Sequence, residues 1–205
     1  MKVEVAPARC GREADVTTSA ATKIQAAFRS RRCRDLHVER VRRGLPWSPF
    51  VPAKMEAVRA MLAVAQLQPG DTLVDVGSGD GRVIVSAAVA TPSLRQAIGV
   101  EIDGALVAQS RRQIEALGLN RRVRVIHDDW LHVDLSDVDV VVLFFLPHAE
   151  IATLLQQKLR AGTRIITYVF QIAQWQPECI TETVPFMTSK GSSFIYRYRV
   201  PPMEL

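Results

Sequence analysis

The chain has 205 residues, 48% of them hydrophobic, and a formal net charge of +5 that is unevenly placed. Residues 1–43 contain eleven Lys and Arg and five Asp and Glu. Residues 44–205 contain fifteen Lys and Arg and sixteen Asp and Glu. The net positive charge therefore comes from the first 43 residues, and it is no evidence that the rest of the chain binds nucleic acid.

Length and composition exclude several classes of protein. A chain of this length can bury the core of one domain and carry a tail besides. No apolar run approaches the roughly 18 residues that span a bilayer, so no transmembrane segment is expected. Three separated cysteines predict reduced thiols in an intracellular compartment, with cytoplasm and mitochondrion both open. The cysteines and the four histidines lack metal-ligand spacing, so no metal is expected.

The N-terminal region divides into two segments. Residues 1–18 have few large apolar side chains and are predicted to be disordered. Residues 19–43 lack Gly and Pro and carry apolar side chains at helical spacing, which predicts one basic helix. Within it, the stretch Ile24 to Arg34 resembles an IQ motif through Ile24, Gln25, Arg29 and Arg34, with Ser30 where Gly is usual. The resemblance implies a calmodulin-like partner.

Three other interpretations of the basic helix stay open. It could fold onto its own domain as a solvated basic helix, direct the chain to mitochondria, or contact a membrane surface or RNA. Glu4, Glu13 and Asp15 count against a mitochondrial transit peptide, because such peptides are poor in acids.

Residues 44–52 form a boundary before the main domain, which we place at residues 53–205. Pro46, Pro49 and Pro52 prevent a helix and favour an extended path. The segment is either a rigid linker or a lid over a site in the next domain, with Trp47 and Phe50 as the lid side chains. Residues 53–66 then recover helical periodicity, and Pro69 and Gly70 end that helix.

Residues 73–85 predict a strand, a tight glycine loop and the start of a helix that continues to Ala90. A dinucleotide fingerprint, Gly-x-Gly-x-x-Gly, would need glycine where the chain has Arg82. The pattern Asp-x-Gly-x-Gly-x-Gly instead resembles motif I of the seven-strand S-adenosylmethionine-dependent methyltransferases. That resemblance implies cofactor binding by Asp75, Gly77, Ser78, Gly79 and Gly81. A tight turn without a ligand is the alternative.

Residues 96–103 read as a second strand that ends in acidic side chains. An acid about 20 residues beyond the glycines accepts hydrogen bonds from ribose hydroxyls in nucleotide-binding units, and Glu101 fits that position. The resemblance implies that Ile102 packs on the adenine. Asp103 is predicted to cap the following helix, residues 105–117.

Residues 123–126 predict a third strand, followed by two acids and a tryptophan. In seven-strand methyltransferases an acid after this strand binds the adenine amino group. The resemblance points to Asp129, with Asp128 as the alternative, and Trp130 is expected to cover the adenine edge. The acids could also simply end the strand.

The most apolar strand spans residues 138–148, as expected at the centre of a parallel sheet. Its carboxyl end, residues 145–148, is expected beside the glycine loop, where the methyl acceptor must arrive. The Asn/Asp-Pro-Pro-Tyr signature of enzymes that methylate nucleobase or amide nitrogens is missing, which disfavours DNA. A helix over 149–160 and strands over 164–170 and 194–200 complete the predicted elements.

Five segments together resemble one small family within this class. They are 49–52, 75–82, 145–147, 158–166 and the positions Phe170, Trp175 and Pro177. Eukaryotic members of that family are mitochondrial protein-lysine methyltransferases that modify the adenine nucleotide translocase and the ATP synthase c subunit. Those enzymes carry an apolar N-terminal membrane segment, whereas this chain has the basic IQ-like helix.

The resemblance implies an α/β fold with a doubly wound, mostly parallel, seven-stranded Rossmann-like sheet, and methyl transfer from S-adenosylmethionine to a lysine side chain. Trp47, Phe145 and Pro147 are the candidate acceptor channel, with Phe170 and Trp175 as further candidates, and ordinary core packing is the alternative for each. No general base is assigned. Two other functions stay open: a methyltransferase acting on a small molecule or RNA, and a catalytically silent calmodulin-binding adaptor on the same fold.

Overall fold

The computed structural model describes residues 35, 38, 50–144 and 150–202. Most of the predicted basic helix, including the IQ-like stretch, lies outside these residues. Four helices are described, namely α3 Met55–Ala65, α4 Arg82–Ala90, α5 Gly104–Ala116 and α6 Ile151–Lys158. The strands are β1 Thr72–Val76, β2 Gln96–Glu101, β3 Val123–His127, β4 Val140–Leu143, β5 Arg164–Tyr168, β6 Cys179–Thr183 and β7 Ser193–Arg199.

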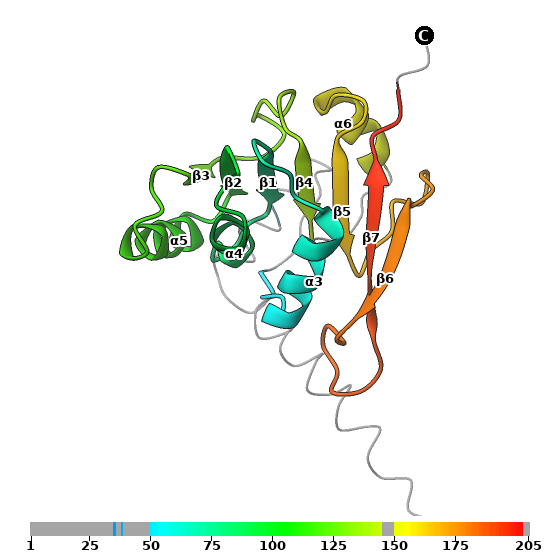
Figure 1. Ribbon diagram of the computed structural model, residues 1–205, viewed down its shortest axis with the longest axis horizontal. Coiled ribbons are helices and arrows are strands. Elements are labelled where there is room, and N and C mark those ends of the chain that lie inside the picture. The colour runs from blue at the N-terminus through cyan, green and yellow to red at the C-terminus, as the bar shows by residue number, and fades with distance from the viewer. Residues whose placement is uncertain (1–34, 36–37, 39–49, 145–149, 203–205) are drawn as a thin grey trace, which may run out of the picture.

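The described strands form one seven-stranded sheet in the order β3-β2-β1-β4-β5-β7-β6 (Figure 1). The first five are parallel, and β7 runs antiparallel to both β5 and β6. This confirms the predicted Rossmann-like sheet. None of the described helices is long and apolar enough to cross a membrane.

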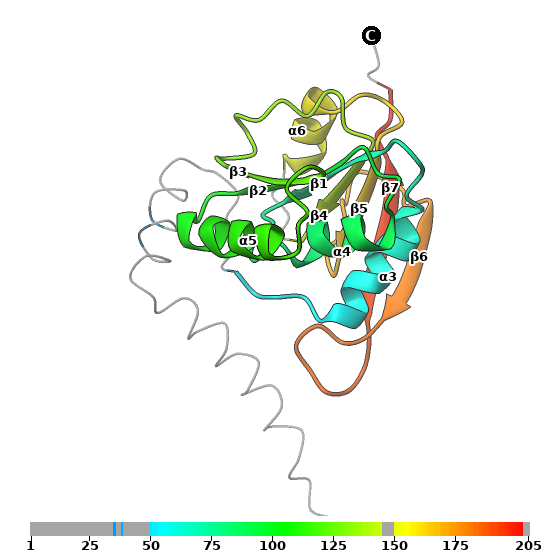
Figure 2. The ribbon, with the colours of Figure 1, turned by 60° about the vertical axis from the view of Figure 1, so that its left-hand side comes forward.

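Helices cover both faces of the sheet, which explains the apolar central strands. Figure 2 shows α3, α4 and α5 on one side and α6 on the other. Alternate strand residues follow this division: Leu73 and Val142 join the core beneath α3 to α5, whereas Val74 and Val141 join the core beneath α6. All four residues of β4 are buried, as expected for a strand covered on both faces.

The edge strand β6 was not predicted from the sequence. Its side chains alternate between half-buried and exposed, and its one large apolar residue, Ile180, is exposed. A short, polar edge strand of this kind carries a weak signal, because only one of its sides is paired and little of it is buried.

The carboxyl ends of the parallel strands share one edge of the sheet with two other segments. The β6–β7 hairpin lies at this edge, because β6 is parallel to β5 and its carboxyl end leads into the hairpin. The start of α3 reaches the same place, where Lys54 Nζ donates to the carbonyl of Thr188 at 3.2 Å. Ligand sites of open α/β sheets lie at this edge.

Candidate functional site at the carboxyl edge of the sheet

The loop between β1 and α4 has the strand, glycine turn and helix that the sequence predicted. Its backbone takes positive φ at three glycines, Gly77 (74°), Gly79 (55°) and Gly81 (83°). Residues with a Cβ adopt this region rarely, so glycine is needed here. The amides of Gly77 and Ser78 both donate to the carbonyl of Val100, at 2.8 and 3.1 Å, which ties the loop to the end of β2.

Glu101, at the end of β2, organises the glycine loop through both carboxylate oxygens. The residue is only 7% exposed. Its Oε2 accepts from the Gly79 amide and its Oε1 from the Asp103 amide, both at 2.8 Å. Charge-assisted hydrogen bonds of this kind are strong, and each oxygen keeps a second lone pair for ribose hydroxyls. Asp103 in turn caps α5 by accepting from Ala105 at 2.7 Å, as predicted.

Asp75 is the most perturbed acid at this edge. It lies on β1 and is 4% exposed. Burial raises the pKa of Asp75 from its ordinary 3.8 to about 8, and the nearby charges of Glu101 and Asp80 act in the same direction. Among the described residues no cation forms an ion pair with it. The carboxyl is therefore mostly protonated at pH 7, and a perturbed acid beside a glycine loop is typical of a binding site.

The glycine loop packs tightly on the elements around it. A Cβ at Gly81 would lie 2.0 Å from Oγ of Ser110 on α5, and a Cβ at Gly99 of β2 would lie 2.5 Å from Oγ of Ser78. Both hydroxyls are buried and have no hydrogen-bond partner among the described residues. Ser78, a predicted cofactor residue, thus packs its side chain against Gly99, and its contact with a cofactor stays a prediction.

Phe50 lies against the glycine loop at Gly79. A Cβ at Gly79 would lie 2.3 Å from Cε2 of Phe50 and 2.6 Å from its Cδ2, so the ring rests directly on the glycine. Phe50 is nevertheless 39% exposed. This is the position expected of a lid residue. Trp47, the other predicted lid side chain, lies outside the described residues.

The two acids after β3 differ in burial. Asp129 is buried, and its Oδ1 accepts from the Leu131 amide at 3.0 Å. Asp128 is exposed; its Oδ1 accepts from the Asp129 amide at 2.7 Å and pairs with His132 at 3.2 Å. The hydrogen bond with His132 holds the pKa of Asp128 below its ordinary value. Asp129 is thus the more enclosed of the two acids predicted for the adenine amino group.

The other two residues predicted to face the adenine lie differently from each other. Ile102 is half-buried directly after β2, and its carbonyl lies 3.2 Å from Nε2 of His127. Trp130 is buried in the core that faces α6. Most of the indole is therefore enclosed by protein, and its contact with an adenine edge stays a prediction.

Three aromatic side chains gather where the acceptor was expected. Phe144 follows β4, Tyr168 ends β5, and Phe186 belongs to the β6–β7 hairpin. The ring centroid of Phe144 lies 4.8 Å from that of Tyr168 and 4.8 Å from that of Phe186. The centroids of Tyr168 and Phe186 are 5.8 Å apart. We call these three residues the aromatic cluster. Sequence reasoning missed it, and the predicted channel residues Trp47, Phe145 and Pro147 lie outside the described residues.

The backbone next to the aromatic cluster is strained. Val169 has φ of +73°, which is unusual for a β-branched residue. Its amide donates to the carbonyl of Phe194 at 2.8 Å, and Thr167 Oγ1 donates to the carbonyl of Phe170 at 2.6 Å. Strain that neighbouring bonds enforce is common at functional sites. Trp175, by contrast, packs in the core on the α6 face, away from the aromatic cluster.

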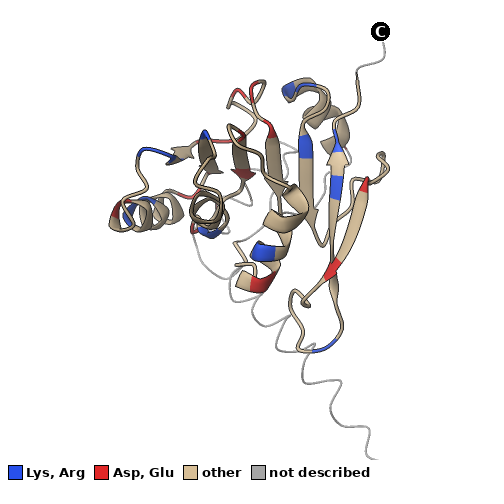
Figure 3. Ribbon diagram, viewed as in Figure 1, with Lys and Arg blue, Asp and Glu red and all other residues tan. Residues whose placement is uncertain are grey.

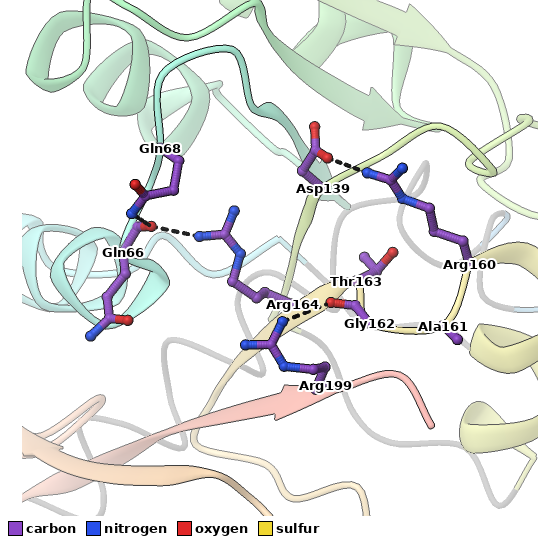
Figure 4. A pocket seen from close by; sticks show the side chains of 9 residues that line it. All are labelled: Gln66, Gln68, Asp139, Arg160, Ala161, Gly162, Thr163, Arg164 and Arg199. Carbon is purple, nitrogen blue, oxygen red and sulfur yellow. Dashed lines mark hydrogen bonds and ion pairs between the residues drawn. The ribbon is translucent and has the colours of Figure 1, made fainter. Parts of the chain in front are cut away.

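A polar cavity of about 500 Å³ opens at the opposite edge of the sheet, away from the glycine loop (Figure 4). Its arginines are already neutralised. The pairs are Arg160 with Asp139, Arg164 with Asp71 at 2.5 Å, and Arg199 with Glu178 at 2.8 Å. The cavity lies at the amino ends of β4 and β5, so we do not assign the cofactor to it.

Known proteins resemble this chain over the same region. The family model for the ANTKMT methyltransferase domain matches residues 75–179. A protein-lysine N-methyltransferase of Saccharolobus islandicus (strain REY15A) is 32% identical over 136 residues, which are 65% of this chain and 84% of the relative. The adenine nucleotide translocase lysine N-methyltransferase of Mus musculus is 31% identical over 156 residues, which are 74% of this chain and 63% of the relative.

A solved structure has the same fold and a bound product. It is an RNA methyltransferase from Salinibacter ruber in complex with S-adenosyl-L-homocysteine, with 28% identity and a TM-score of 0.68. The match covers 76% of this chain and 97% of that one.

The residues at the carboxyl edge fit S-adenosylmethionine. A Cβ at Gly77 would meet no atom of the described residues within 4 Å, so on their side the loop leaves room for a ligand. The buried carboxylate of Glu101 stands beside the loop for a ribose, and Asp129 follows the next strand. The loop, these two acids and Asp75 are the groups that would hold the cofactor. The chain belongs to the ANTKMT methyltransferase domain family and is a class I S-adenosylmethionine-dependent methyltransferase.

Proposed function

We propose that the acceptor of this methyltransferase is the side-chain amine of a protein lysine. The observation that carries the proposal is the likeness to the protein-lysine N-methyltransferase of Saccharolobus islandicus, of which the match covers 84%. The mouse relative, named for lysine methylation of the adenine nucleotide translocase, supports the same acceptor chemistry. The match covers only 63% of that relative, so we do not extend its particular substrate to this chain.

The chemistry makes limited demands on the protein. S-adenosylmethionine supplies an activated methyl group on a sulfonium, so the chain must align a neutral amine with it and exclude water. A free lysine has a pKa of about 10.4, and the site must therefore favour loss of a proton. Apolar walls do this, because desolvation lowers the pKa of an amine.

In this proposal the aromatic cluster forms part of the acceptor wall, and Trp47, Phe145 and Pro147 complete the channel. The ring faces attract the ammonium form before it loses its proton. The hydroxyl of Tyr168 donates to the carbonyl of Val184 at 3.3 Å, and burial raises the pKa of Tyr168 above its ordinary value. Tyr168 is therefore protonated at neutral pH. Because it is fully buried, it supports the half-buried rings of Phe144 and Phe186, which face the channel, and the proposal assigns no general base.

The test is methyl transfer from radiolabelled S-adenosylmethionine by the full chain to a cell extract, with Glu101→Ala as the cofactor-binding control. Label should enter protein, appear as methyl-lysine after hydrolysis, and vanish when the lysines of the extract are first acetylated chemically. Label in the small-molecule fraction would contradict the proposal. No transfer at all would favour the silent adaptor.

RNA is the second candidate acceptor, because the Salinibacter ruber relative is named an RNA methyltransferase. Charge argues against it here: residues 44–205 carry fifteen Lys and Arg against sixteen Asp and Glu, and the two signs are mixed over the described elements (Figure 3). An RNA contact through the basic N-terminal segment would make the KM for the acceptor rise steeply with salt. Label that is lost on ribonuclease treatment and has such a salt dependence would replace lysine by RNA.

We further propose that the IQ-like stretch, Ile24 to Arg34, binds a calmodulin-like partner and regulates the enzyme. The support is the sequence pattern alone, because this stretch lies outside the described residues. The full chain should bind calmodulin, and a double substitution, Ile24→Ala with Gln25→Ala, should abolish binding. Equal binding by both chains would contradict this part of the proposal.

A further inference from the structure

Arg82 occupies a position where helices disfavour a cation. It is the first residue of α4, and the first turn of that helix contains no acidic residue. The helix N-terminus carries partial positive charge, so an arginine here is locally unfavourable. Local rules are broken most often where a residue has a functional task, and the contacts of Arg82 indicate which task.

The guanidinium of Arg82 joins two separate segments. Its Nε donates to Asp80 Oδ1 at 2.9 Å, and its Nη2 donates to Asp80 Oδ2 at 2.5 Å. Its Nη1 donates to the carbonyl of Ala53 at 2.6 Å. Asp80 stands between Gly79 and Gly81 within the glycine loop, whereas Ala53 precedes α3. The planar fork of arginine suits this double contact, which a lysine cannot reproduce.

Residues 50–54, which we call the strap, are held at three points. The ring of Phe50 rests on Gly79, and the carbonyl of Ala53 accepts from Arg82. Lys54 Nζ donates to Thr188 in the β6–β7 hairpin at 3.2 Å. That hairpin also supplies Phe186 to the aromatic cluster. The strap therefore runs from the glycine loop to the segment that carries part of the acceptor wall.

We propose that Arg82 is a positioning residue that fixes the strap on the glycine loop, so that Phe50 closes the cofactor site at Gly79 and the hairpin is held in register with it. Arg82 acts through Asp80 and Ala53. Its loss releases the strap while the sheet and its core stay intact, because the guanidinium lies at the edge of the domain and is a quarter exposed. Only the effect on the acceptor depends on the proposed lysine methylation.

The test compares Arg82→Lys with Arg122→Lys in the full chain. Arg122 also donates through Nη1 to backbone carbonyls, those of Ala88 at 2.9 Å and Pro92 at 3.3 Å, but at the other end of α4. The first readout is the rate of trypsin cleavage after Lys54, followed by mass spectrometry. The second is the Kd of S-adenosylmethionine by calorimetry. Unfolding midpoints establish that both variants are folded.

Arg82→Lys should speed cleavage after Lys54 and raise the Kd by about three- to tenfold, the change expected for one net hydrogen bond. Arg122→Lys should match the wild type in both readouts. Cleavage and Kd of Arg82→Lys equal to those of the wild type would overturn the proposal. Equal changes in both variants would also overturn it, because the effect would then be general to α4.

A second variant, Phe50→Ala, tests whether the strap is the route of the effect. If Arg82 acts by placing Phe50, the double variant Phe50→Ala, Arg82→Lys should bind S-adenosylmethionine no more weakly than the weaker single variant. If the double variant instead loses affinity by the product of the two single-variant factors, the two residues act independently and the proposal is overturned. Phe50 is half-exposed, so its removal leaves the core intact.

Methyl transfer gives the last readout. For a lysine acceptor, Arg82→Lys should raise KM more than it lowers kcat, because it displaces a wall of the site and no reacting group. A fall in kcat alone would overturn this part. Absence of transfer to lysine by the wild type would defeat the proposed function, whereas the cleavage rate and the Kd would still decide the role of Arg82.

Discussion

A buried aspartate lies near each end of β1, and the two differ in whether a cation pairs with them. Asp71, just before the strand, accepts from Arg164 at 2.5 Å and from the Gln68 amide at 2.6 Å. Asp75, near the other end, forms no ion pair among the described residues, and burial raises its pKa to about 8. The amino end is built from matched charges that hold α3 and the sheet together, while the carboxyl end keeps an unmatched acid beside a glycine loop.

This difference separates stability from function along a single strand. Buried pairs are costly to break, because removing one partner leaves an uncompensated charge. A buried acid without a partner costs stability when it is ionised. It suits a site for a cationic ligand, because the ligand's charge favours the ionised form once it is bound, and S-adenosylmethionine carries a sulfonium and an ammonium. Substitutions at the amino end of β1 should therefore lower stability, whereas substitutions at its carboxyl end should change pH dependence or cofactor binding.

The largest effect is expected at the amino end. Arg164→Met should lower the free energy of unfolding by about 3–5 kcal/mol, because it leaves Asp71 buried without its partner. The side chains of this pair are only 13% and 11% exposed. Urea denaturation measures the loss. The affinity of the folded protein for S-adenosylmethionine should not change, since Arg164 lies at the edge of the sheet opposite to the glycine loop.

Arg160→Met is the matched control for this pair. Its partner is Asp139, and Arg160 is 54% exposed, so solvent screens the interaction. The expected loss is at most about 1 kcal/mol. Equal losses in the two variants, or a loss of cofactor affinity in Arg164→Met, would contradict the division between the two ends of β1.

At the carboxyl end, Asp75→Asn should remove a pH dependence of stability. The folded-state pKa of Asp75 is raised above its ordinary 3.8 to about 8, so between these values the folded protein holds a proton that the unfolded chain has lost. The contribution of Asp75 to the stability of the wild type is therefore fully present below about pH 4 and is lost as the pH rises toward 8. The slope is at most about 1.4 kcal/mol per pH unit.

Urea denaturation at several pH values between 5 and 8 measures this slope. The wild type should lose stability relative to Asp75→Asn as pH rises. A constant difference between the two proteins over this range would show that Asp75 titrates normally, and the carboxyl end would then not hold an unmatched neutral acid.

A smaller effect on ligand binding is expected at Glu101. Glu101→Ala should weaken S-adenosylmethionine binding by more than about tenfold, or about 1.5–3 kcal/mol, because the ribose contact and the bond that orders Gly79 are both lost. Calorimetry measures the Kd. Glu182→Ala, which removes an exposed glutamate on β6, is the control and should bind as the wild type does. A Kd for Glu101→Ala within twofold of the wild type would remove Glu101 from the site.

The sequence was sufficient for those parts of the site that short stretches encode. The alternate glycines after an apolar strand predicted the loop, and the acid that ends the next strand predicted the position of Glu101. Asp103 was predicted as a cap because its side chain needs only the amides two and three residues further along the chain. Each of these depends on residues that are neighbours along the chain or on a register that parallel strands impose.

Features built from distant segments were not predictable in the same way. The aromatic cluster joins residues from the end of β5, the β6–β7 hairpin and the position directly after β4, and none of them has a distinctive local pattern. In the sequence Arg82 excluded a dinucleotide fingerprint and formed part of the family-like segment 75–82. Its contact with Ala53 was not predicted, because that contact depends on where α3 begins. The positive φ of Val169 also has no sequence signal, since neighbours in β7 and the following loop enforce it.

The smallest expected effects concern the two buried hydroxyls beside the glycine loop, and they separate packing from binding. Ser110 and Ser78 both lack a hydrogen-bond partner among the described residues. Ser110→Ala should raise the free energy of unfolding by about 1 kcal/mol, because it removes a buried polar group that has no partner, and should leave the Kd of S-adenosylmethionine unchanged. Ser78→Ala should stabilise the free protein similarly but weaken cofactor binding, if the Ser78 hydroxyl serves as the sequence predicts. An unchanged Kd in Ser78→Ala would assign this serine to packing against Gly99 alone, and the glycine loop would then hold its ligand through backbone amides and the neighbouring acids.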